Sequence, residues 1–312
     1  MNTTPRHRHA AASAAANALL ERVHAQAPGN PSAGVDVSFE FFPPATPAGA
    51  DKLWQTVTTL ESYRPRYVSM TYGAGGSTQD RTIGEIERII TNSSLAVVGH
   101  LTTVGHPAAH VDAVIDRYLE LGVDGIVALR GDPPEGSDDG RHPDGYPDAA
   151  ALVAAIRARS DVEIAVGAYP ETHPRAASPE ADLDNLKRKV DAGADVAITQ
   201  FFFDTDLFEA FVDRVRTAGI DVPIVPGIMP IVNLERVHAF ADRCGATVPA
   251  WVDELYVGLD DDPETRAEVS AALAADQCRR LAAAGADSFH FYTLNQPSLT
   301  TRICDLLGVA AT

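Results

Sequence analysis

The 312-residue sequence contains few cysteines and few basic residues. Its three cysteines, Cys244, Cys278 and Cys304, lie far apart and form no C-x-x-C pair, which argues against a disulfide framework and against a zinc ribbon. Lys plus Arg number 25 and Asp plus Glu number 43, so the formal net charge is −18. A surface this acidic repels phosphate backbones, so we expect no nucleic-acid partner, although a locally basic pocket for a small anion is compatible with it.

Long apolar runs and clear targeting segments are also missing. No run approaches the roughly 18 apolar residues of a membrane span, so we expect no membrane partner and a cytoplasmic location. The alanine-rich stretch near the start is interrupted by Glu21 and Arg22, unlike the apolar region of a secretion signal. We expect residues 1–34 to form a tail and a short amphipathic helix that is dispensable for chemistry.

What the sequence does contain is a regular alternation of strand-like and helix-like segments. Eight runs rich in β-branched or aromatic residues are each followed by a helical pattern, and several are apolar nearly throughout, as strands buried on both faces are. Ser178 and Pro179 open one helix with a cap and a proline at its first position, and Gly193 ends it. The predicted strands are residues 35–42, 66–72, 96–101, 125–130, 163–169, 196–202, 224–228 and 288–294.

Eight strand–helix units predict an α/β fold, a single (β/α)8 TIM barrel. The segment before the last strand is long enough for one extra helix. No G-x-G-x-x-G turn marks a doubly wound sheet, and no Pro/Gly/Ser-rich linker divides the chain. We therefore predict an N-terminal tail and helix over 1–34 and one barrel domain over 35–312.

In such a barrel the reactive groups lie where the strands end. Glu40 stands out because Phe39, Phe41 and Phe42 flank it in the sequence. Apolar surroundings favour a protonated carboxyl group, which suits a general acid near neutral pH. The alternative is an ion pair between Glu40 and a barrel arginine.

Three further features of the strand ends have both a functional and a structural interpretation. Asp132 follows Arg130 and Gly131 and could be catalytic or could cap its own turn. The glycine run at 73–76 could hold a phosphate or form a plain flexible loop. Asp182, Asn185 and Lys189 share one helix face with Arg188 beside it, and this face could grip a phosphate-bearing ligand or simply be solvated. His100 and His173 show no metal-ligand spacing, so we predict no metal site.

Taken together, the strings at the strand ends resemble the catalytic domain of methylenetetrahydrofolate reductase. They occur in family order and cover roughly residues 35 to 308 of the chain. Each string alone is modest, but the ordered set is specific. The matching segments are 39–44 (FEFFPP), 71–78 (TYGAGGST), 129–132 (LRGD), 168–171 (AYPE) with His173, 185–193 (NLKRKVDAG), 199–204 (TQFFFD), 225–230 (VPGIMP) and 289–295 (FHFYTLN).

The resemblance implies a barrel that holds non-covalent FAD and works by a ping-pong reaction. NADH or NADPH reduces the flavin and leaves, and 5,10-methylenetetrahydrofolate then enters and becomes 5-methyltetrahydrofolate, a step of one-carbon metabolism that leads to methionine biosynthesis. It implies a homo-oligomer. The flavin contacts that it implies are Tyr72, Ala74, His100, Arg130, Gly131, Asp132, Tyr169, His173, Asp182, Asn185, Arg188 and Lys189.

The resemblance also implies how substrate is bound. Thr71 resembles a nicotinamide-cofactor contact, Gln200 a contact for folate and nicotinamide, and Phe240 and Gln296 occupy substrate-binding positions. Two positions depart from the family pattern: Gln296 stands where bacterial relatives often have arginine, and Arg236 where some have glutamine. Animal-type members append a domain that binds S-adenosylmethionine, and we expect none here.

The residues support a division of labour in this chemistry. Opening the folate's five-membered ring needs a proton at the departing nitrogen, and Glu40 is the expected donor. Asp132 is expected to place negative charge near the flavin and the cationic folate intermediate. Gln200 suits the amide edge of the pterin. The rival hypotheses are a flavin- or folate-binding barrel without reductase activity and a metal-dependent aldolase barrel.

Overall fold

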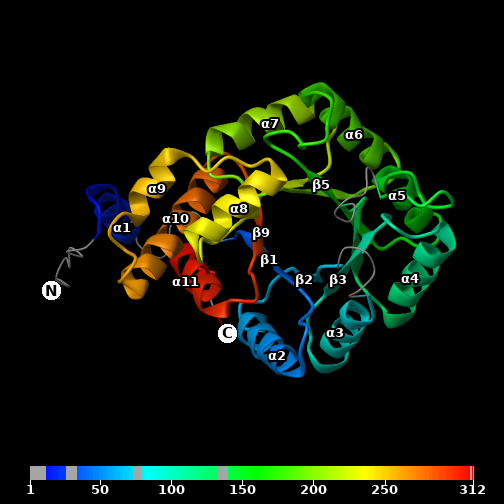
Figure 1. Ribbon diagram of the computed structural model, residues 1–312, viewed down its shortest axis with the longest axis horizontal. Coiled ribbons are helices and arrows are strands. Elements are labelled where there is room, and N and C mark those ends of the chain that lie inside the picture. Colours follow the sequence, from blue (N-terminus) through cyan, green and yellow to red (C-terminus); the bar gives the residue numbers. More distant parts are fainter. Residues whose placement is uncertain (1–11, 26–33, 73–78, 133–139, 310, 312) are drawn as a thin grey trace.

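The computed structural model describes residues 12–25, 34–72, 79–132, 140–309 and 311. Nine parallel strands form one sheet that curls into a nearly closed barrel, and helices surround it (Figure 1). This confirms the predicted TIM-barrel fold. The strands are β1 (Asp36–Phe41), β2 (Tyr67–Met70), β3 (Val97–Thr102), β4 (Gly125–Leu129), β5 (Glu163–Ala168), β6 (Val196–Thr199), β7 (Ile224–Val225), β8 (Gly227–Ile228) and β9 (Ser288–Tyr292).

The helices alternate with the strands, as the sequence pattern predicted. In the described ranges they are α1 (Ala14–Ala25), α2 (Pro47–Glu61), α3 (Gln79–Asn92), α4 (Ala108–Leu121), α5 (Ala149–Arg157), α6 (Pro179–Asp191), α7 (Thr205–Thr217), α8 (Leu234–Cys244), α9 (Ala250–Tyr256), α10 (Pro263–Ala283) and α11 (Pro297–Leu307). The segment between β8 and β9 holds α8, α9 and α10, where the pattern predicted a barrel helix and one extra. The prediction was therefore one helix short. Gly245 ends α8 with φ +71°, and Asp262 caps α10 through the Thr265 N–H, so these two helices have local stop and start signals.

The predicted strand over 224–228 is divided by Pro226. Its first half, β7, pairs with β6, and its second half, β8, pairs with β9. Proline has no N–H for a sheet hydrogen bond, but the Pro226 carbonyl accepts a 3.0 Å bond from the His290 N–H. The chain therefore changes its pairing partner from β6 to β9 at Pro226, and this change closes the barrel.

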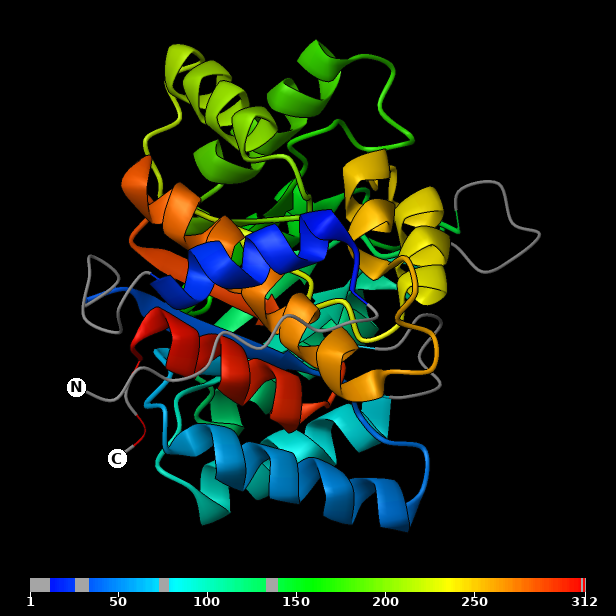
Figure 2. The same ribbon diagram turned by 90° about the vertical axis from the view of Figure 1, so that its left-hand side faces the viewer.

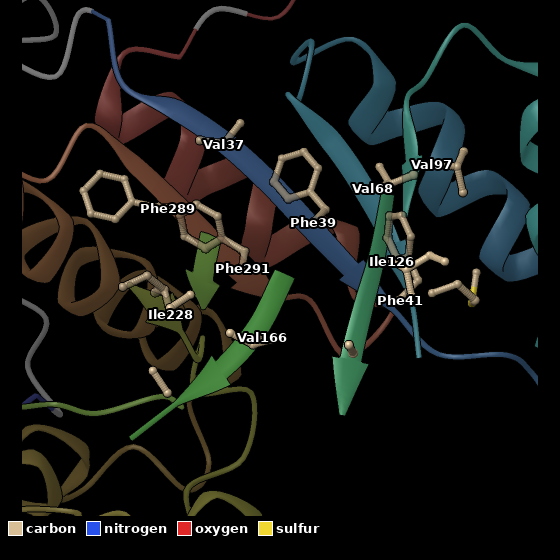
Figure 3. Close-up of a cluster of buried hydrophobic side chains, with 14 of the residues drawn as sticks. Val37, Phe39, Phe41, Val68, Val97, Ile126, Val166, Ile228, Phe289 and Phe291 are labelled. Atoms are coloured by element: carbon tan, nitrogen blue, oxygen red, sulfur yellow. The ribbon is translucent and has the colours of Figure 1, made fainter. Parts of the chain in front are cut away.

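Successive residues of β1 face opposite sides of the barrel wall. Phe39 and Phe41 are fully buried in the cluster between the sheet and the surrounding helices, together with Phe291 (Figure 3). The inner cluster consists of Tyr67, Val98, Val127, Ala165, Val196, Ile198 and Val225, from β2 to β7. Because side chains alternate along a strand, Ser38 and Glu40 face the barrel interior beside this cluster.

Helix α1 packs across α10 on the outside of the barrel (Figure 2). Its buried residues Ala16, Leu19, Leu20 and Val23 belong to a second apolar cluster, which also contains Phe201 and residues of α8, α9 and α10. The Arg22 guanidinium donates two hydrogen bonds, 2.9 and 2.8 Å long, to the Asp276 carboxylate. Removal of α1 would expose this cluster, so we expect it to cost stability, and the expectation that the segment is dispensable for chemistry stays a prediction.

We therefore predict that Leu20→Ala destabilises the folded protein. Deleting a buried leucine side chain costs about 2–5 kcal/mol, and the low end applies at this peripheral helix. Thermal unfolding would measure the change, with His24→Ala on the exposed face of α1 as the matched control. Deletion of residues 2–30 should lower the melting temperature further, and a deletion variant that melts like the full chain would contradict this view of α1.

Candidate active site

The carboxyl ends of the strands surround a cavity of about 370 Å³. In a parallel barrel these ends meet at one mouth, so residues distant in sequence converge there. Glu40, Thr71, Tyr72, His100, Tyr169, Gln200 and Phe240 all line this cavity, as the sequence led us to expect. Met229, Cys244, His290 and Tyr292 also line it, and none of these was among the predicted site residues.

Glu40 lies in polar surroundings rather than the apolar ones expected from its neighbours in sequence. Its Oε2 is 3.5 Å from His100 Nε2 and 3.7 Å from His290 Nε2, and its side chain is 20% exposed. The phenylalanines on either side of it in β1 point to the opposite face of the strand. Among the described residues, the basic side chains within 4.0 Å of its carboxyl group are these two histidines, not the arginine of the alternative.

The two histidines differ in how the interior affects them. Burial lowers the pKa of His100 to about 4, so this imidazole is neutral at physiological pH. His290 is 1% exposed, stacks on Tyr67 with ring centroids 5.8 Å apart, and has its Nδ1 2.7 Å from Ser38 Oγ. The alternation Phe289, His290, Phe291, Tyr292 was the sequence signal for it, because period-two spacing turns His290 and Tyr292 inward.

The turn after β9 holds the end of β1 in place. The Thr293 hydroxyl donates a 2.6 Å hydrogen bond to the Glu40 carbonyl. The Asn295 amide bonds both the N–H and the carbonyl of Phe42, at 3.2 and 2.9 Å. Leu294 and Asn295 adopt positive φ angles of 50° and 53° to make this turn. These bonds hold the backbone at Glu40 and Phe42 in place, while the side chain of Glu40 lines the cavity.

A second cavity of about 560 Å³ adjoins the first and shares Leu129, Gly167 and Tyr169 with it. It gathers the remaining predicted cofactor residues that the structure describes. These are Arg130, Gly131, Asp132, His173, Asp182, Asn185, Arg188 and Lys189, with Tyr169 at the junction. Ala74 lies outside the described residues.

The second cavity is locally basic although the chain is strongly acidic. Arg130, Arg141, Arg175, Arg188 and Lys189 line it together with Asp132, Asp148 and Asp182. Such a surplus of guanidinium and ammonium groups suits a phosphate-bearing ligand. A locally basic pocket, which the acidic composition had allowed, is therefore present at the mouth of the barrel.

Helix α6 organises this cavity from one side. Ser178 caps it by accepting the Ala181 N–H, and Asp182 accepts the His173 N–H at 2.8 Å. Lys189 is buried and donates to the Gly167 carbonyl, and burial lowers its pKa to about 8. Arg188 donates to Asn185 at 2.8 Å and to Asp148 at 2.7 Å. The polar face predicted from spacing is therefore assembled against β5 and α5.

Two other predicted positions behave differently. Gln296 lines neither cavity and precedes α11, with its backbone N–H bonded to the Thr293 carbonyl. Arg236 lies in the first turn of α8, where its N–H donates to the capping Asn233. The structure thus does not bring Gln296 to the cavity with Gln200 and Phe240.

Asp132 lies at the end of β4 with an exposed side chain, close enough to Tyr169 and His173 to affect both. Burial, opposed in part by Asp182 and Asp132, lowers the pKa of His173. The turn that Asp132 would cap runs into residues 133–139, which lie outside the described residues. Asp132 itself lines the second cavity.

No group of three or more His, Cys, Asp or Glu side chains with metal-binding geometry occurs in the part of the chain that the structure describes. Over the same residues, no helix is both long and apolar enough to cross a membrane.

Comparison with known proteins identifies relatives along nearly the whole chain. The methylenetetrahydrofolate reductase family model matches residues 26–308. The 5,10-methylenetetrahydrofolate reductase of Escherichia coli (strain K12) is 44% identical over 301 residues, covering 96% of this chain and 97% of that protein. The corresponding protein of Pectobacterium carotovorum subsp. carotovorum is 45% identical over 275 residues, covering 88% and 91%.

A solved structure with a similar fold is that of an uncharacterised protein from Clostridium thermocellum that binds two copies of 5-methyl-5,6,7,8-tetrahydrofolic acid. Its TM-score is 0.59 at 12% identity, over 88% of this chain and 94% of that one. At this identity the likeness supports the barrel fold alone.

A hydrogen-bonded bridge between Glu171 and Thr247 joins two loops beside the cavity, and its contribution to the rigidity of α8 can be tested. Glu171 accepts the Thr247 N–H at 2.9 Å and also its hydroxyl at 2.5 Å, which ties the loop after β5 to the loop after α8, the helix that carries Phe240 and Cys244. We predict that Glu171→Ala speeds amide hydrogen exchange across residues 240–249 several-fold, because both bonds are lost. Glu209→Ala on the exposed side of α7 should leave exchange there unchanged. Equal exchange in both variants would show that the bridge does not restrain α8.

Proposed function

The chain belongs to the methylenetetrahydrofolate reductase family, and we propose that it reduces 5,10-methylenetetrahydrofolate to 5-methyltetrahydrofolate with NADH or NADPH, by a ping-pong mechanism through non-covalent FAD. The observation that carries the proposal is the pair of adjoining cavities. One holds Glu40 and Gln200 at the barrel mouth. The other lies beside it and holds Arg130, Arg188 and Lys189, which we call the basic clamp.

FAD fits the residues of this mouth. The diphosphate and adenosine would be held in the second cavity by Arg130, Arg188 and Lys189, and the flavin ring would extend past Tyr169 toward Tyr72 and His100. The Tyr72 hydroxyl and His100 Nε2 are buried atoms without a hydrogen-bond partner among the described residues, and a polar ligand would supply partners. When bound, FAD supplies the ability to take hydride from the nicotinamide and give it to the folate.

Glu40 is the group suited to protonate the folate. The bridging methylene carbon accepts hydride only after the five-membered ring has opened to an iminium cation, and opening requires a proton on the departing nitrogen. Glu40 lies inside the cavity with one carboxyl oxygen toward the two histidines. In this role it acts as a general acid and is used only in the folate half-reaction.

Gln200 and Asp132 serve binding and charge. The Gln200 Oε1 already accepts the Phe201 N–H at 3.0 Å, so its amide NH₂ is the part left to donate to the pterin or the nicotinamide. Asp132 places a carboxylate near the mouth, where it would stabilise the cationic iminium. Phe240 from α8 lines the cavity and offers a flat apolar surface to a ring.

The same proposal covers the wider setting of the protein. Family membership supports NADH as the donor, a cytoplasmic enzyme of one-carbon metabolism and methionine biosynthesis, and a homo-oligomer. A visible spectrum of purified protein tests the central claim. Flavin absorption should bleach with NADH and return with methylenetetrahydrofolate, and added FAD should bind far more tightly than FMN because only FAD reaches the basic cavity. A protein that binds flavin but never returns electrons to folate would be a passive binder instead.

We predict that Glu40→Gln separates the two half-reactions. The substitution keeps the size of the side chain and removes the acid, so folate reduction should slow by roughly 10² or more. Flavin reduction by NADH should stay within about two-fold, since no folate proton is involved. Rapid-mixing kinetics of each half-reaction would measure both rates, and an equal loss in the two would make Glu40 a structural residue.

We predict that Asp132→Asn raises the midpoint potential of the bound flavin. Removing a negative charge stabilises the reduced, anionic flavin, and because the Asp132 side chain is exposed, about 30 mV is the upper limit. Folate reduction should slow and flavin reduction should not. Spectroelectrochemical titration measures the shift, with Asp184→Asn on the exposed side of α6 as the control. A variant with lower flavin occupancy and an unchanged potential would support a turn-capping role.

A further inference from the structure

A cavity of about 340 Å³ lies on the outside of the barrel, between α1, α9, α10 and the start of α7. These first three helices gather on one side of the barrel, and α1 contacts both of the others (Figure 1). The described residues that line this cavity are all different from those that line the two cavities at the barrel mouth. Small-molecule sites commonly measure about 300–1,000 Å³. The cavity therefore has the size of a ligand site and is separate from the proposed active site.

The walls of this outer cavity are largely apolar. Leu19 of α1, Leu255 of α9 and Leu273 of α10 line it, and all three side chains are buried. Phe203 lines it from the segment after β6, and Trp251 lies at its rim with 42% of its surface exposed. Aliphatic and aromatic side chains in one wall favour a ligand with a sizeable apolar body, which can pack against them.

Two buried side chains in the wall have unused hydrogen-bonding capacity. Thr205 is 2% exposed, and its hydroxyl oxygen has no hydrogen-bond partner among the described residues. Gln277 is 6% exposed and its Nε2 donates to the Phe202 carbonyl at 2.6 Å, which leaves its Oε1 without a described donor. Buried polar groups are normally paired, and the cavity is far larger than one ordered water needs. These two groups therefore indicate a ligand with polar atoms at this wall.

The rim of the outer cavity carries charges of both signs. Arg22 and Asp276 are bonded to each other, so their charges balance. Glu254 is exposed and forms no ion pair with any residue that the structure describes. Arg280 approaches Asp206 only to 3.9 Å, and the two side chains are 56% and 86% exposed. One carboxylate and one guanidinium thus remain for groups of opposite charge on a ligand.

We propose that this cavity binds an α-amino acid with a large apolar side chain. Glu254 and Gln277 Oε1 are acceptors, which suit the ammonium group of such a ligand. Arg280 is a donor and the Thr205 hydroxyl can donate, which suits the carboxylate. The apolar side chain would pack on Phe203 and the three leucines. A hydrocarbon would leave all four polar groups unused, and a simple cation or anion would use only half of them.

The outer cavity and the active-site cavity share one segment of the chain, residues 200–205. Gln200 and Phe201 line the active-site cavity, whereas Phe203 and Thr205 line the outer one. The rings of Phe201 and Phe203 lie with their centroids 6.0 Å apart. A ligand in the outer cavity would therefore touch the segment that carries Gln200, but its binding does not depend on the proposed function.

The test is fluorine NMR of the full-length protein with fluorotryptophan at its two tryptophan positions, Trp54 and Trp251. Trp251 lines the outer cavity, whereas Trp54 lies on α2 beneath the Arg88 guanidinium. Titration with L-phenylalanine should shift the Trp251 signal to saturation, with a Kd of the order of 1 mM for a ligand of this size. The Trp54 signal should stay in place, and Trp251→Phe identifies which signal is which.

Three analogues divide the probe into its parts. Alanine lacks the apolar body, phenylpropionate lacks the ammonium group and phenylethylamine lacks the carboxylate. Each should bind at least about fivefold more weakly than L-phenylalanine, the order of magnitude of one lost hydrogen bond. Equal binding of phenylpropionate or phenylethylamine would overturn the assignment of an amino acid, and equal binding of alanine would overturn the role of the apolar walls.

Thr205→Val tests the wall of the cavity with little risk to folding, because it replaces an unpaired hydroxyl with a methyl group of similar size. Affinity for L-phenylalanine should fall about fivefold. Thr102→Val is the matched control, since the Thr102 hydroxyl is also buried and unpartnered among the described residues but lies outside the cavity. Its affinity should equal that of the wild-type protein.

Three results would overturn the proposal. The first is a Trp251 signal that L-phenylalanine does not shift to saturation. The second is an affinity that Thr205→Val leaves unchanged, or that both threonine variants lower equally. The third is a Trp251 signal that moves with protein concentration instead of with L-phenylalanine, which would assign the cavity to a contact between copies of the chain.

Discussion

The pairing of β1 with β9 is the contact on which both the barrel and its site depend. It joins Ser38 to His290 across 252 positions of the chain and places Tyr292 beside Glu40. Closing so long a loop costs conformational entropy, which the fully buried Phe39 and Phe291 of the same two strands help to offset. The Thr293 and Asn295 bonds to the end of β1 then fix the backbone of the proposed acid. A barrel open at this seam would separate Glu40 from the histidine behind it.

The two cavities have different proposed tasks, proton transfer and anion binding. The net charge of the whole chain, −18, gives no sign of the basic second cavity. Proton transfer is assigned to the interior of the barrel mouth, where the groups around Glu40 are imidazoles, hydroxyls and aromatic rings. Anion binding is assigned to the outer cavity, where α6 supplies Arg188 and the buried Lys189. Tyr169 belongs to both cavities, so one ligand can extend from the basic clamp to the acid.

The position of Glu40 was predicted correctly from a line of reasoning that the structure revises. In the sequence its neighbours are phenylalanines, but in a strand adjacent side chains point to opposite faces, so those rings pack against helices instead. The groups that do face Glu40 come from β3 and β9, and no local pattern could pair them with it. For Gln296 the prediction failed. It directly follows the matching segment 289–295 and was expected at a substrate-binding position, but it does not line the cavity.

The sequence by itself determined the barrel, the order of its strands and the strand ends at which the polar residues lie, because strand and helix periods, caps and prolines act over a few residues. It also determined the polar face of α6, since helical spacing places Asp182, Asn185 and Lys189 together. Tertiary structure alone decided the division of the predicted seventh strand into β7 and β8 at Pro226, the burial of α1 on α10, and the contact of His290 with Ser38 and Glu40. Those features arise from closure of the barrel, which brings together side chains whose separation along the chain carries no local signal.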